Sequence, residues 1–570
     1  MINKLWKIKE IQDEFIIKSL AETINISEVL ARLLVLRKIT NFGEAKKFFR
    51  PTLESLYDPF QMLGMKEATK RIIKAITENQ NICIYGDYDV DGTCSTALLY
   101  LFLKKLGANV NFFIPKRLTE GYGISKAGIE YVKSLNTDLL ISVDCGITAI
   151  DEVNYANELG INVIICDHHQ SKDIVPAAVA VLDPLQPGCN YPYKYLAGAG
   201  VAFKLAQGLA KEVNQKDLPL EYLDLVALAS IADIVPLIDE NRILVREGLK
   251  LINEKPRPGI AALMKLSNNG QGSLSSGQIV FTLAPRINAV GRMGDAQRAV
   301  ELFISDNLSE AVKLAEVLES DNRDRRKIDE ETFFAADVLV KDIDLENEIP
   351  IVLHKESWHS GVIGIVASRL VEKYYRPTIM LTTVDGVAKG SARSISNFNI
   401  YNALKECEDL LIHFGGHQAA AGLAVEIDKI DEFKSKFNTV VKGALSKENL
   451  RPEIVIDAVI KFSEITPKFL RIIDQFAPFG PGNMRPVFLS ENVEVTGLPR
   501  IVGNNHLIVN LKQCGSEKIF DCIGFNFGNY CKVLNKNSIL DVVYSIDKLG
   551  KDDFIFPQLK IKDIKIKENN

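Results

Sequence analysis

The stretch Ile84-Tyr-Gly-Asp-Tyr-Asp-Val-Asp-Gly92 places carboxylates on alternate residues, at Asp87, Asp89 and Asp91. It follows an apolar run typical of a strand and precedes a run typical of a helix. Alternate residues share one side wherever the backbone is extended, and like charges that close repel and shift one another's pKa. Because packing alone does not require such a cluster, we expect a hard metal ion to neutralise it.

Further acidic motifs follow downstream, and they are Val143-Asp-Cys-Gly146, Cys166-Asp-His-His169 and Ile231-Ala-Asp-Ile-Val-Pro236. The first two directly follow short apolar runs, and open α/β sheets bind ligands beyond the carboxyl ends of their strands. The last follows the helix-like run Leu223–Ser230. Taken alone, Val143-Asp-Cys-Gly146 is more typical of a turn, and the pair His168-His169 is more typical of a polar surface or a protein core. In series they indicate a site for Mn²⁺ or Mg²⁺, built from carboxylates and imidazoles.

Such a ligand set predicts a metal-dependent hydrolase. Two ions about 3.5–4 Å apart, bridged by one carboxylate, activate water and stabilise the leaving oxygen of a phosphate ester. Asp144 is the candidate bridge. The candidate metal ligands are Asp87, Asp89, Asp91, Asp144, His168 and Asp233.

Length and composition limit the class of protein. A chain of 570 residues with 47% hydrophobic and 25% charged residues predicts a globular protein of about three or four domains. No apolar run approaches the roughly 20 residues of a membrane helix, and the first residues lack a signal-peptide core, so we expect a cytoplasmic protein. The net charge of −5 gives no global argument for nucleic acid, although a basic groove can still exist locally.

Short apolar runs alternating with helical stretches begin near Asn81 and predict a parallel sheet. A second such region begins near Ile351, and many short β-like runs follow Pro452. We expect the lysine-rich tail Lys560–Asn570 to be frayed. The expected fold is α/β multidomain: a helical segment at 1–75, a parallel-sheet domain at 76–300, a long connecting helix at 301–345, a second α/β domain at 346–450 and a β-barrel at 451–570.

Together the motifs resemble those of the DHH phosphoesterase superfamily, and Asp167-His168-His169 is the motif that defines it. The resemblance runs from about Phe42 onward. It implies that the second α/β domain is a DHH-associated (DHHA1) domain and that the barrel is an OB-like domain for single strands. Downstream segments are similar to the branch that degrades single-stranded DNA, and they are Ala284–Arg292, Gly361–Ser368, Gly390–Ser394, Phe414–Gly422 and Phe479–Pro486.

The resemblance implies roles for further residues. His169 and His417 join the metal ligands as catalytic residues. Arg117, Ser391 and Arg393 are expected to hold a 5′-terminal phosphate, since arginine gives bidentate hydrogen bonds to phosphate. Tyr122 is expected to block or stack near that end. The expected nucleic-acid-binding set is Arg117, Tyr122, Arg286, Asn288, Arg292, Ser391 and Arg393.

The expected function is that of a single-stranded-DNA-specific 5′→3′ exonuclease in DNA recombination and repair, with two Mn²⁺ or Mg²⁺ ions, that releases 5′-mononucleotides. The resemblance implies a single-strand-binding protein and a helicase as partners. One alternative is a DHH phosphodiesterase for short oligonucleotides or cyclic dinucleotides, a class that usually ends after the DHHA1 domain. The other is a non-catalytic DNA-binding scaffold, which loses metal ligands. The β-rich extension opposes the first alternative, and the full acidic set opposes the second.

Overall fold

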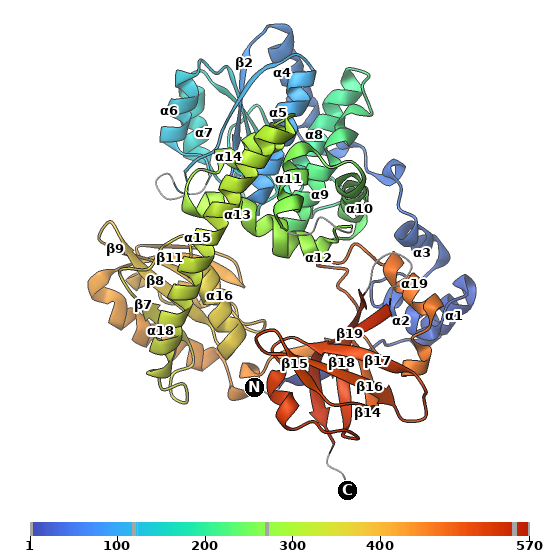
Figure 1. The fold of residues 1–570 in the computed structure, drawn as a ribbon. Helices are drawn as coiled ribbons and strands as arrows, with labels where there is room; N and C mark the ends of the chain where they lie inside the picture. The colour runs from blue at the N-terminus through green and yellow to red at the C-terminus, as the bar shows by residue number, and fades with distance from the viewer. Residues whose placement is uncertain (1–3, 117–120, 122, 268–272, 550–555, 568–570) are drawn as a thin grey trace.

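The computed structural model describes residues 4–116, 121, 123–267, 273–549 and 556–567. Figure 1 shows an α/β lobe at the top, a second α/β lobe at the lower left and a β-barrel at the lower right. The long helix α15 (Leu308–Lys341) runs from the first lobe to the second. The fold class expected from the sequence is confirmed.

The first lobe contains a parallel five-stranded sheet in the order β3-β2-β4-β5-β6. Successive residues of a strand face opposite sides of the sheet, so Ile82 and Ile84 face one helical layer while Cys83 and Tyr85 face the other. The strands are β2 (Asn81–Gly86), β3 (Asn109–Phe113), β4 (Leu139–Val143), β5 (Asn162–Cys166) and β6 (Ala180–Leu182).

Helices cover both faces of this sheet. The face of Ile82 packs on α4 (Met65–Thr77), α5 (Val90–Lys105) and α8 (Gly198–Glu212). The opposite face packs on α6 (Lys126–Ser134) and α7 (Ile150–Glu158). The rest of the lobe is helical and consists of α9 (Leu223–Ala232), α10 (Asp239–Glu254), α11 (Pro258–Leu266), α12 (Ser276–Gln278), α13 (Ala284–Met293) and α14 (Gln297–Ile304).

The second lobe contains a mixed sheet in the order β10-β11-β9-β8-β7, in which β7 and β8 are parallel and the other pairs antiparallel. One face packs on α15 and α16 (Ile363–Tyr374), and the other on α17 (Ile400–Lys405) and α18 (Ile430–Ala444). The strands are β7 (Ile351–His354), β8 (Thr378–Val384), β9 (Val387–Arg393), β10 (His413–Gly416) and β11 (Ala420–Glu426).

The third lobe is a closed barrel, because β14 and β16, the first and last strands of the series β14-β18-β19-β17-β16, also pair with each other. The expectation of a frayed tail is wrong for residues 560–567, where Ile561 and Ile564 are buried in the barrel. The closing strands are β14 (Phe488–Val495), β16 (His506–Gln513), β17 (Ile519–Gly524), β18 (Ile539–Leu549) and β19 (Phe556–Ile566), with β13 (Ala458–Val459) and β15 (Arg500–Val502) beside them.

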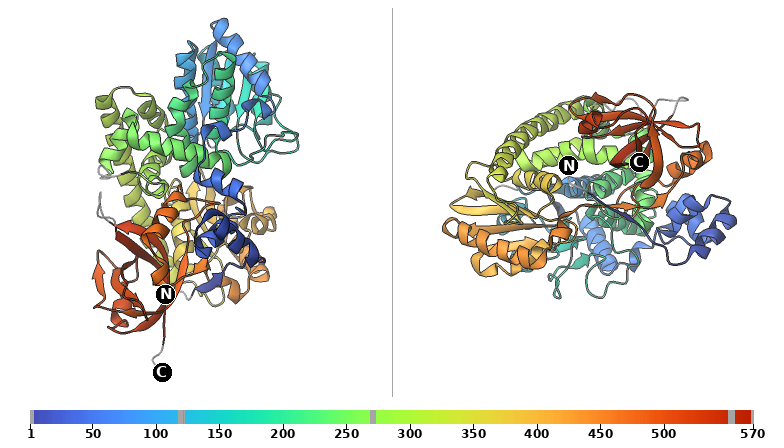
Figure 2. Two further views of the ribbon diagram at one scale, coloured as in Figure 1. Left: turned by 90° about the vertical axis from the view of Figure 1, so that its right-hand side faces the viewer. Right: turned by 90° about the horizontal axis from the view of Figure 1, so that it is seen from below.

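The N-terminal segment packs on this barrel. Strand β1 (Leu5–Ile8) pairs in parallel with β12 (Glu453–Ile456). Helices α1 (Glu14–Ile24), α2 (Glu28–Val35) and α3 (Phe42–Phe49) share one apolar core with the barrel. They lie beside α19 (Pro467–Gln475), as both views in Figure 2 show. Among the described helices, none has the length and apolar character that a membrane crossing requires.

Candidate metal centre

Motif side chains emerge together at the carboxyl edge of the first sheet. The register pairs Gly86 of β2 with Val143 of β4, and Val143 with Cys166 of β5. The next residue along each strand is an aspartate, at Asp87, Asp144 and Asp167. The sheet therefore fixes three motifs in one row, at the edge where the sequence predicted a ligand site.

The first motif turns from strand into helix, so its carboxylates have separate structural roles. Asp89 caps the start of α5 and accepts hydrogen bonds from the backbone N–H groups of Asp91 (2.8 Å) and Gly92 (3.1 Å). Asp91 is buried and accepts hydrogen bonds from the N–H groups of Gly198 (2.6 Å) and Ala199 (2.7 Å), where α8 begins. The start of α8 thus holds Asp91 in place and stabilises its negative charge.

Asp144 lies in the middle of the cluster. Asp87, Asp89 and Asp144 each offer a carboxylate oxygen within 4.8 Å of the other two. The backbone of Asp144 is left-handed (φ 59°), which costs energy for a residue other than glycine. A Cβ on Gly198 would lie 2.8 Å from the Cβ of Asp144, so only glycine fits there. The chain stores strain at this position and packs closely around it, as functional sites do.

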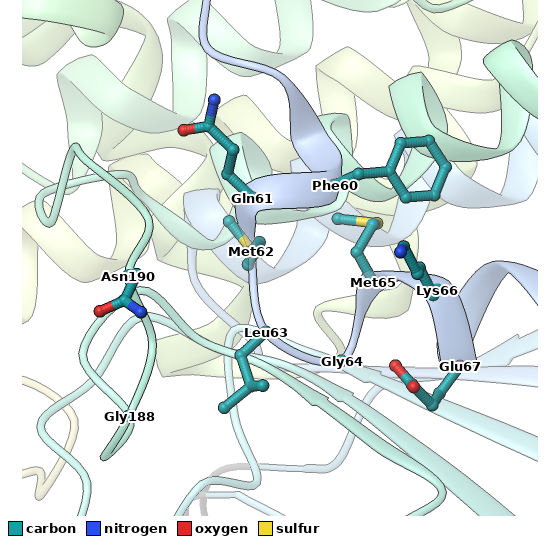
Figure 3. A pocket seen from close by; sticks show the side chains of 10 residues that line it. All are labelled: Phe60, Gln61, Met62, Leu63, Gly64, Met65, Lys66, Glu67, Gly188 and Asn190. Carbon is teal, nitrogen blue, oxygen red and sulfur yellow. The ribbon is translucent and has the colours of Figure 1, made fainter.

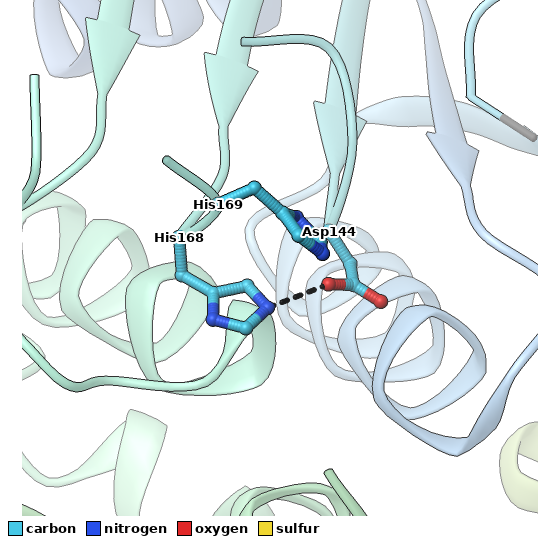
Figure 4. A group of neighbouring side chains, drawn as sticks. All are labelled: Asp144, His168 and His169. Carbon is cyan, nitrogen blue, oxygen red and sulfur yellow. Dashed lines mark hydrogen bonds and ion pairs between the residues drawn. The ribbon is translucent and has the colours of Figure 1, made fainter. Parts of the chain in front are cut away.

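His168 connects Asp144 with the remaining motif carboxylates. Its Nε2 lies 3.1 Å from Oδ1 of Asp144, and Figure 4 shows the two side chains pointing toward each other. The same nitrogen lies 3.7 Å from Oδ2 of Asp91 and 3.7 Å from Oδ2 of Asp233. Asp91, His168 and Asp233 form a second group of candidate ligands, and Asp144 also groups with His168 and His169. Asp144 therefore lies between two sets of metal-type ligands.

Asp167 positions the histidine pair. Its Oδ1 accepts hydrogen bonds from the backbone N–H of His168 (2.7 Å) and lies 2.7 Å from Nδ1 of His169, while Oδ2 accepts from the N–H of Ile147 (2.9 Å). Burial lowers the pKa of His168 to about 4, which keeps its ring neutral and able to bind a metal. Burial also opposes a charge on His169, but the Asp167 carboxylate outweighs this and raises the pKa of His169 to about 9.

The carboxylates of the cluster resist ionisation without a cation. Burial, followed by repulsion from neighbouring aspartates, raises the pKa of Asp91 to about 7 and that of Asp233 to about 8. The same causes raise the pKa of Asp144 well above its usual range. Divalent ions would take the place of the protons and remove the repulsion. Carboxylate oxygens with one or two imidazole nitrogens are the donors that Mn²⁺ and Mg²⁺ accept, so the residues fit these ions.

The expected phosphate-binding residues of the second lobe lie close together. Ser391 and Arg393 lie on β9, and Nη1 of Arg393 donates to Oγ of Ser391 over 2.9 Å. A Cβ on Gly364 would lie 2.8 Å from that oxygen and 2.9 Å from Nη2 of Arg393, so the first turn of α16 packs against both. His417 is exposed in the turn between β10 and β11, where its N–H donates to the carbonyl of Ala420 (2.8 Å), the register partner of Arg393.

Helix α13 joins the metal cluster to the second lobe. Oδ1 of Asn288 accepts a hydrogen bond from the N–H of Val90 (3.2 Å), in the first turn of α5. One turn later, Nη1 of Arg292 donates to the carbonyl of Gly361 (2.9 Å), just before α16. Asn288 was expected to bind DNA. In the structure its side chain instead contacts the first motif and supports it.

The other expected DNA contacts divide into two kinds. Arg286 is buried, with its Nε 2.5 Å from Oε2 of Glu319 on α15 and its Nη1 donating to the carbonyl of Thr282 (2.6 Å). The structure therefore places Arg286 where it holds α13 to α15, and not on an exposed surface. Arg117 and Tyr122 lie outside the described residues.

Sequence reasoning missed one carboxylate of this edge. Asp183 directly follows β6, is fully buried, and accepts a hydrogen bond from the N–H of Leu185 (2.6 Å). Burial raises its pKa to about 7, and the charges of Asp167 and His169 also act on it. The only signal in the sequence was an aspartate after a short apolar run. A strand of three residues is too short for that pattern to stand out.

A pocket elsewhere in the first lobe does not belong to this centre. It has a volume of about 260 Å³ and is formed by the segment that leads into α4 and by a neighbouring turn (Figure 3). Gly64 passes close to Val181 there, and a Cβ on Gly64 would lie 2.7 Å from the carbonyl oxygen of Val181. The lining contains none of the motif residues, so this pocket gives no argument for catalysis.

Comparison with known families agrees with the division into lobes. Residues 81–230 match the DHH family N-terminal domain, residues 337–443 the DHHA1 domain and residues 456–563 the RecJ OB domain. The single-stranded-DNA-specific exonuclease RecJ of Bacillus subtilis is 39% identical over 566 residues, which covers 99% of this chain and 71% of that protein. The RecJ of Escherichia coli is 34% identical over 519 residues, covering 87% of this chain and 89% of that protein.

Solved structures give the same relation. RecJ of Thermus thermophilus in complex with Mn²⁺ superposes with a TM-score of 0.84 at 28% identity, covering 99% of this chain and 80% of that chain. The same protein with Mg²⁺ gives a TM-score of 0.78 at 26% identity, with 99% and 79% covered. Sequence identity over nearly the whole chain, the ordered lobes and the Asp/His cluster agree: the chain belongs to the RecJ family of single-stranded-DNA-specific exonucleases.

Proposed function

We propose that this chain removes nucleotides from the 5′ end of single-stranded DNA by metal-dependent hydrolysis and releases 5′-mononucleotides. The observation that carries the proposal is the position of Asp144, which belongs both to the group with Asp87 and Asp89 and to a group with His168. The names of the relatives, single-stranded-DNA-specific exonucleases, support the substrate. The Mn²⁺ and Mg²⁺ complexes of the Thermus protein support the choice of metal.

We assign Asp87 and Asp89 to one metal ion and Asp91, His168 and Asp233 to the other, with Asp144 shared. These residues would hold two divalent ions, which, when bound, would supply a water of lowered pKa and neutralise charge on the leaving oxygen of the phosphodiester.

The protein's own residues prepare this chemistry. His168 is neutral and can offer Nε2 as a ligand, while Asp167 keeps His169 charged beside the cluster. The positive ring of His169 is placed to attract a phosphate oxygen.

Recognition of the 5′ end is assigned to the second lobe. Ser391, Arg393 and the first turn of α16 gather donors and a helix N-terminus, the combination that binds phosphate groups. The hydrogen bond from Arg292 to Gly361 fixes this group relative to the metal cluster. His417, at the same end of the β9–β11 sheet, is assigned to the scissile phosphate. A phosphate held at a set distance from the metals makes cleavage stepwise from one end.

The barrel and the cluster argue against the alternative functions. An enzyme for cyclic dinucleotides or short oligonucleotides does not need the closed barrel that follows the DHHA1 domain. A scaffold does not need candidate ligands held by a helix N-terminus and a strained aspartate. We therefore propose that the barrel holds the single strand. We place the protein in the cytoplasm, with a single-strand-binding protein and a helicase as partners, on family grounds.

Titration with Mn²⁺ tests the proposal directly. Calorimetry should show two ions bound per chain, and electron paramagnetic resonance should show spin coupling, because in the proposed centre both ions would share Asp144. Asp144→Asn should abolish the coupling, whereas Asp151→Asn, on the exposed first turn of α7, should leave it unchanged. Binding of a single ion, or coupling that persists in Asp144→Asn, would contradict the proposed centre.

A further inference from the structure

A second pocket, of about 770 Å³, lies between the second lobe and the barrel. Phe333 on α15 and Arg369 on α16 line one side, and Phe525 and Lys565 of the barrel line the other. Its volume lies within the roughly 300–1,000 Å³ of small-molecule sites. Its lining includes none of the carboxylates of the metal centre, so the pocket is a separate site.

Aromatic rings and cations both line this pocket. The guanidinium of Arg369 lies 4.0 Å from the centre of the Phe333 ring. The ammonium of Lys565 lies 4.0 Å from the ring of Trp6, which stands just outside the lining. Phe525 is 49% exposed although it is a large apolar side chain. Nucleotides present a flat base and a phosphate, and rings interleaved with cations are the surface that binds both.

The charges of the lining favour an anion, although the whole chain carries −5. The cationic side chains outnumber the acidic ones, which are Glu372 and Asp563. Oδ2 of Asp563 accepts a hydrogen bond from the indole N–H of Trp6 (2.7 Å), which offsets part of its charge. Arg369 shares its charge with Asp329 (3.0 Å), but that carboxylate lies outside the lining.

The pocket lies away from the face that OB barrels commonly use. That face is built on the second and third barrel strands and their flanking loops, which here are β16 and β17. The barrel part of the pocket instead comes from the segment Phe525–Tyr530, between β17 and β18, and from the end of β19. The second lobe supplies the opposite wall, so an occupant would contact both lobes.

We propose that this pocket binds a nucleotide, with the base stacked on Phe525 and the phosphate between Arg369 and Lys565. The occupant is either one unit of a DNA strand or a free mononucleotide, since both offer the same base and phosphate. The proposal does not depend on the assignment of the metal ligands.

Trp6 gives a local probe for the test. The chain has two tryptophans, and the other one, Trp358, is buried in the second lobe. Trp358→Phe therefore leaves Trp6 as the only reporter, in contact with Lys565. Thymidine 5′-monophosphate and a 12-nucleotide oligothymidylate are titrated separately, with EDTA present to prevent hydrolysis. Calorimetry on the chain with both tryptophans replaces the fluorescence measurement if Trp358→Phe does not fold.

Saturable quenching is expected, and Phe525→Ala or Lys565→Gln should each weaken it about tenfold, the scale of one lost base stack. The matched controls Phe556→Ala and Lys567→Gln change exposed residues at the start of β19 and just after its end. Both lie outside the pocket, so these variants should leave the affinity unchanged. Binding of both probes identifies a site for free nucleotides, and binding of the oligonucleotide alone identifies a strand site.

An affinity equal in Phe525→Ala, Lys565→Gln and the controls would overturn the proposal, as would the absence of saturable binding by either probe up to millimolar concentration. Hydrolysis of labelled DNA with Mn²⁺ is measured separately on the unaltered chain. Failure of that assay would count against the metal centre and not against this pocket.

Discussion

Replacing Asp144 by asparagine should lower hydrolysis and raise the stability of the metal-free protein at the same time. Asparagine keeps the size of the side chain and removes its charge. Asp144 is the residue shared by two groups of candidate ligands, so both ions of the proposed centre would lose a partner. Metal ions contribute several kcal/mol to a phosphoryl-transfer transition state, and a loss of about 4 kcal/mol lowers kcat about 1,000-fold.

The gain in stability follows from the removed repulsion. Unit charges at the 4.8 Å limit of this cluster repel by about 3.5 kcal/mol at an effective dielectric constant of about 20. Proton uptake limits the penalty at pH 7 to about 4 kcal/mol, because a carboxyl group with the usual pKa of 3.8 then binds a proton instead. We therefore expect Asp144→Asn to stabilise the protein in EDTA by about 2–4 kcal/mol, which raises Tm by about 5–10 °C for a lobe of this size.

The assay compares both quantities in the same preparations. Release of labelled mononucleotide is measured with Mn²⁺, and thermal unfolding is measured by circular dichroism in EDTA, with Asp151→Asn as the control. Hydrolysis within tenfold of the unaltered chain would refute the shared-ligand role of Asp144. A lower Tm in EDTA would refute the account of the cluster as mutually repelling carboxylates.

Gly198→Ala should weaken Mn²⁺ binding at least tenfold in calorimetry, because the new Cβ would lie 2.8 Å from the Cβ of Asp144 and 3.0 Å from its Oδ1. An unchanged affinity for Mn²⁺ would show that α8 does not position Asp144. Arg393→Gln should raise KM for a 5′-phosphorylated oligonucleotide at least tenfold and abolish its advantage over a 5′-hydroxyl substrate, while Lys389→Gln, exposed on the same strand, should do neither. In EDTA, the free energy of unfolding should fall as pH rises from about 4 to 7. The pKa of Asp91 is raised to about 7, so between these pH values the folded state binds more protons than the unfolded state. Denaturation measured at several pH values should show that Mn²⁺ suppresses this dependence of the unfolding free energy on pH. An equal dependence with and without Mn²⁺ would contradict the prediction.

The sequence predicted the first sheet well, because its inner strands are continuous apolar runs. The apolar run Leu139–Val143 is β4 itself, and the apolar run Val163–Cys166 is all of β5 except its first residue. Runs with few apolar residues were missed, such as β9 and β10 with their glycines. In β19, lysines alternate with the buried residues and hid the pattern of a strand.

Contacts between distant segments lay beyond sequence reasoning. Nothing in Leu5–Ile8 indicates that its partner is Glu453–Ile456, because backbone pairing leaves little mark on side-chain choice in one chain. The same limit applies to Arg242, whose guanidinium donates to the carbonyls of Phe48, Phe476 and Gln475 and so joins the first lobe to the barrel.

For the candidate site, the motifs predicted which residues gather but not how each is held. Asp87, Asp144 and His168 lie together as expected, since each follows a strand of one parallel sheet. The support of Asp91 by the start of α8 depends on a helix more than a hundred residues away, which no local pattern reveals. The family resemblance marked Asn288 as a functional residue, but nothing in the sequence indicated that its side chain bonds to the backbone of Val90.

One measurement tests the central claim most directly. A single-stranded oligonucleotide, labelled separately at its 5′ and 3′ ends, is incubated with the chain and Mn²⁺, Mg²⁺ or EDTA. We predict immediate release of mononucleotide from the 5′ label, late release from the 3′ label and no release in EDTA. Release from the 3′ end first, cleavage confined to very short or cyclic substrates, or tight binding without cleavage under either metal would contradict the account.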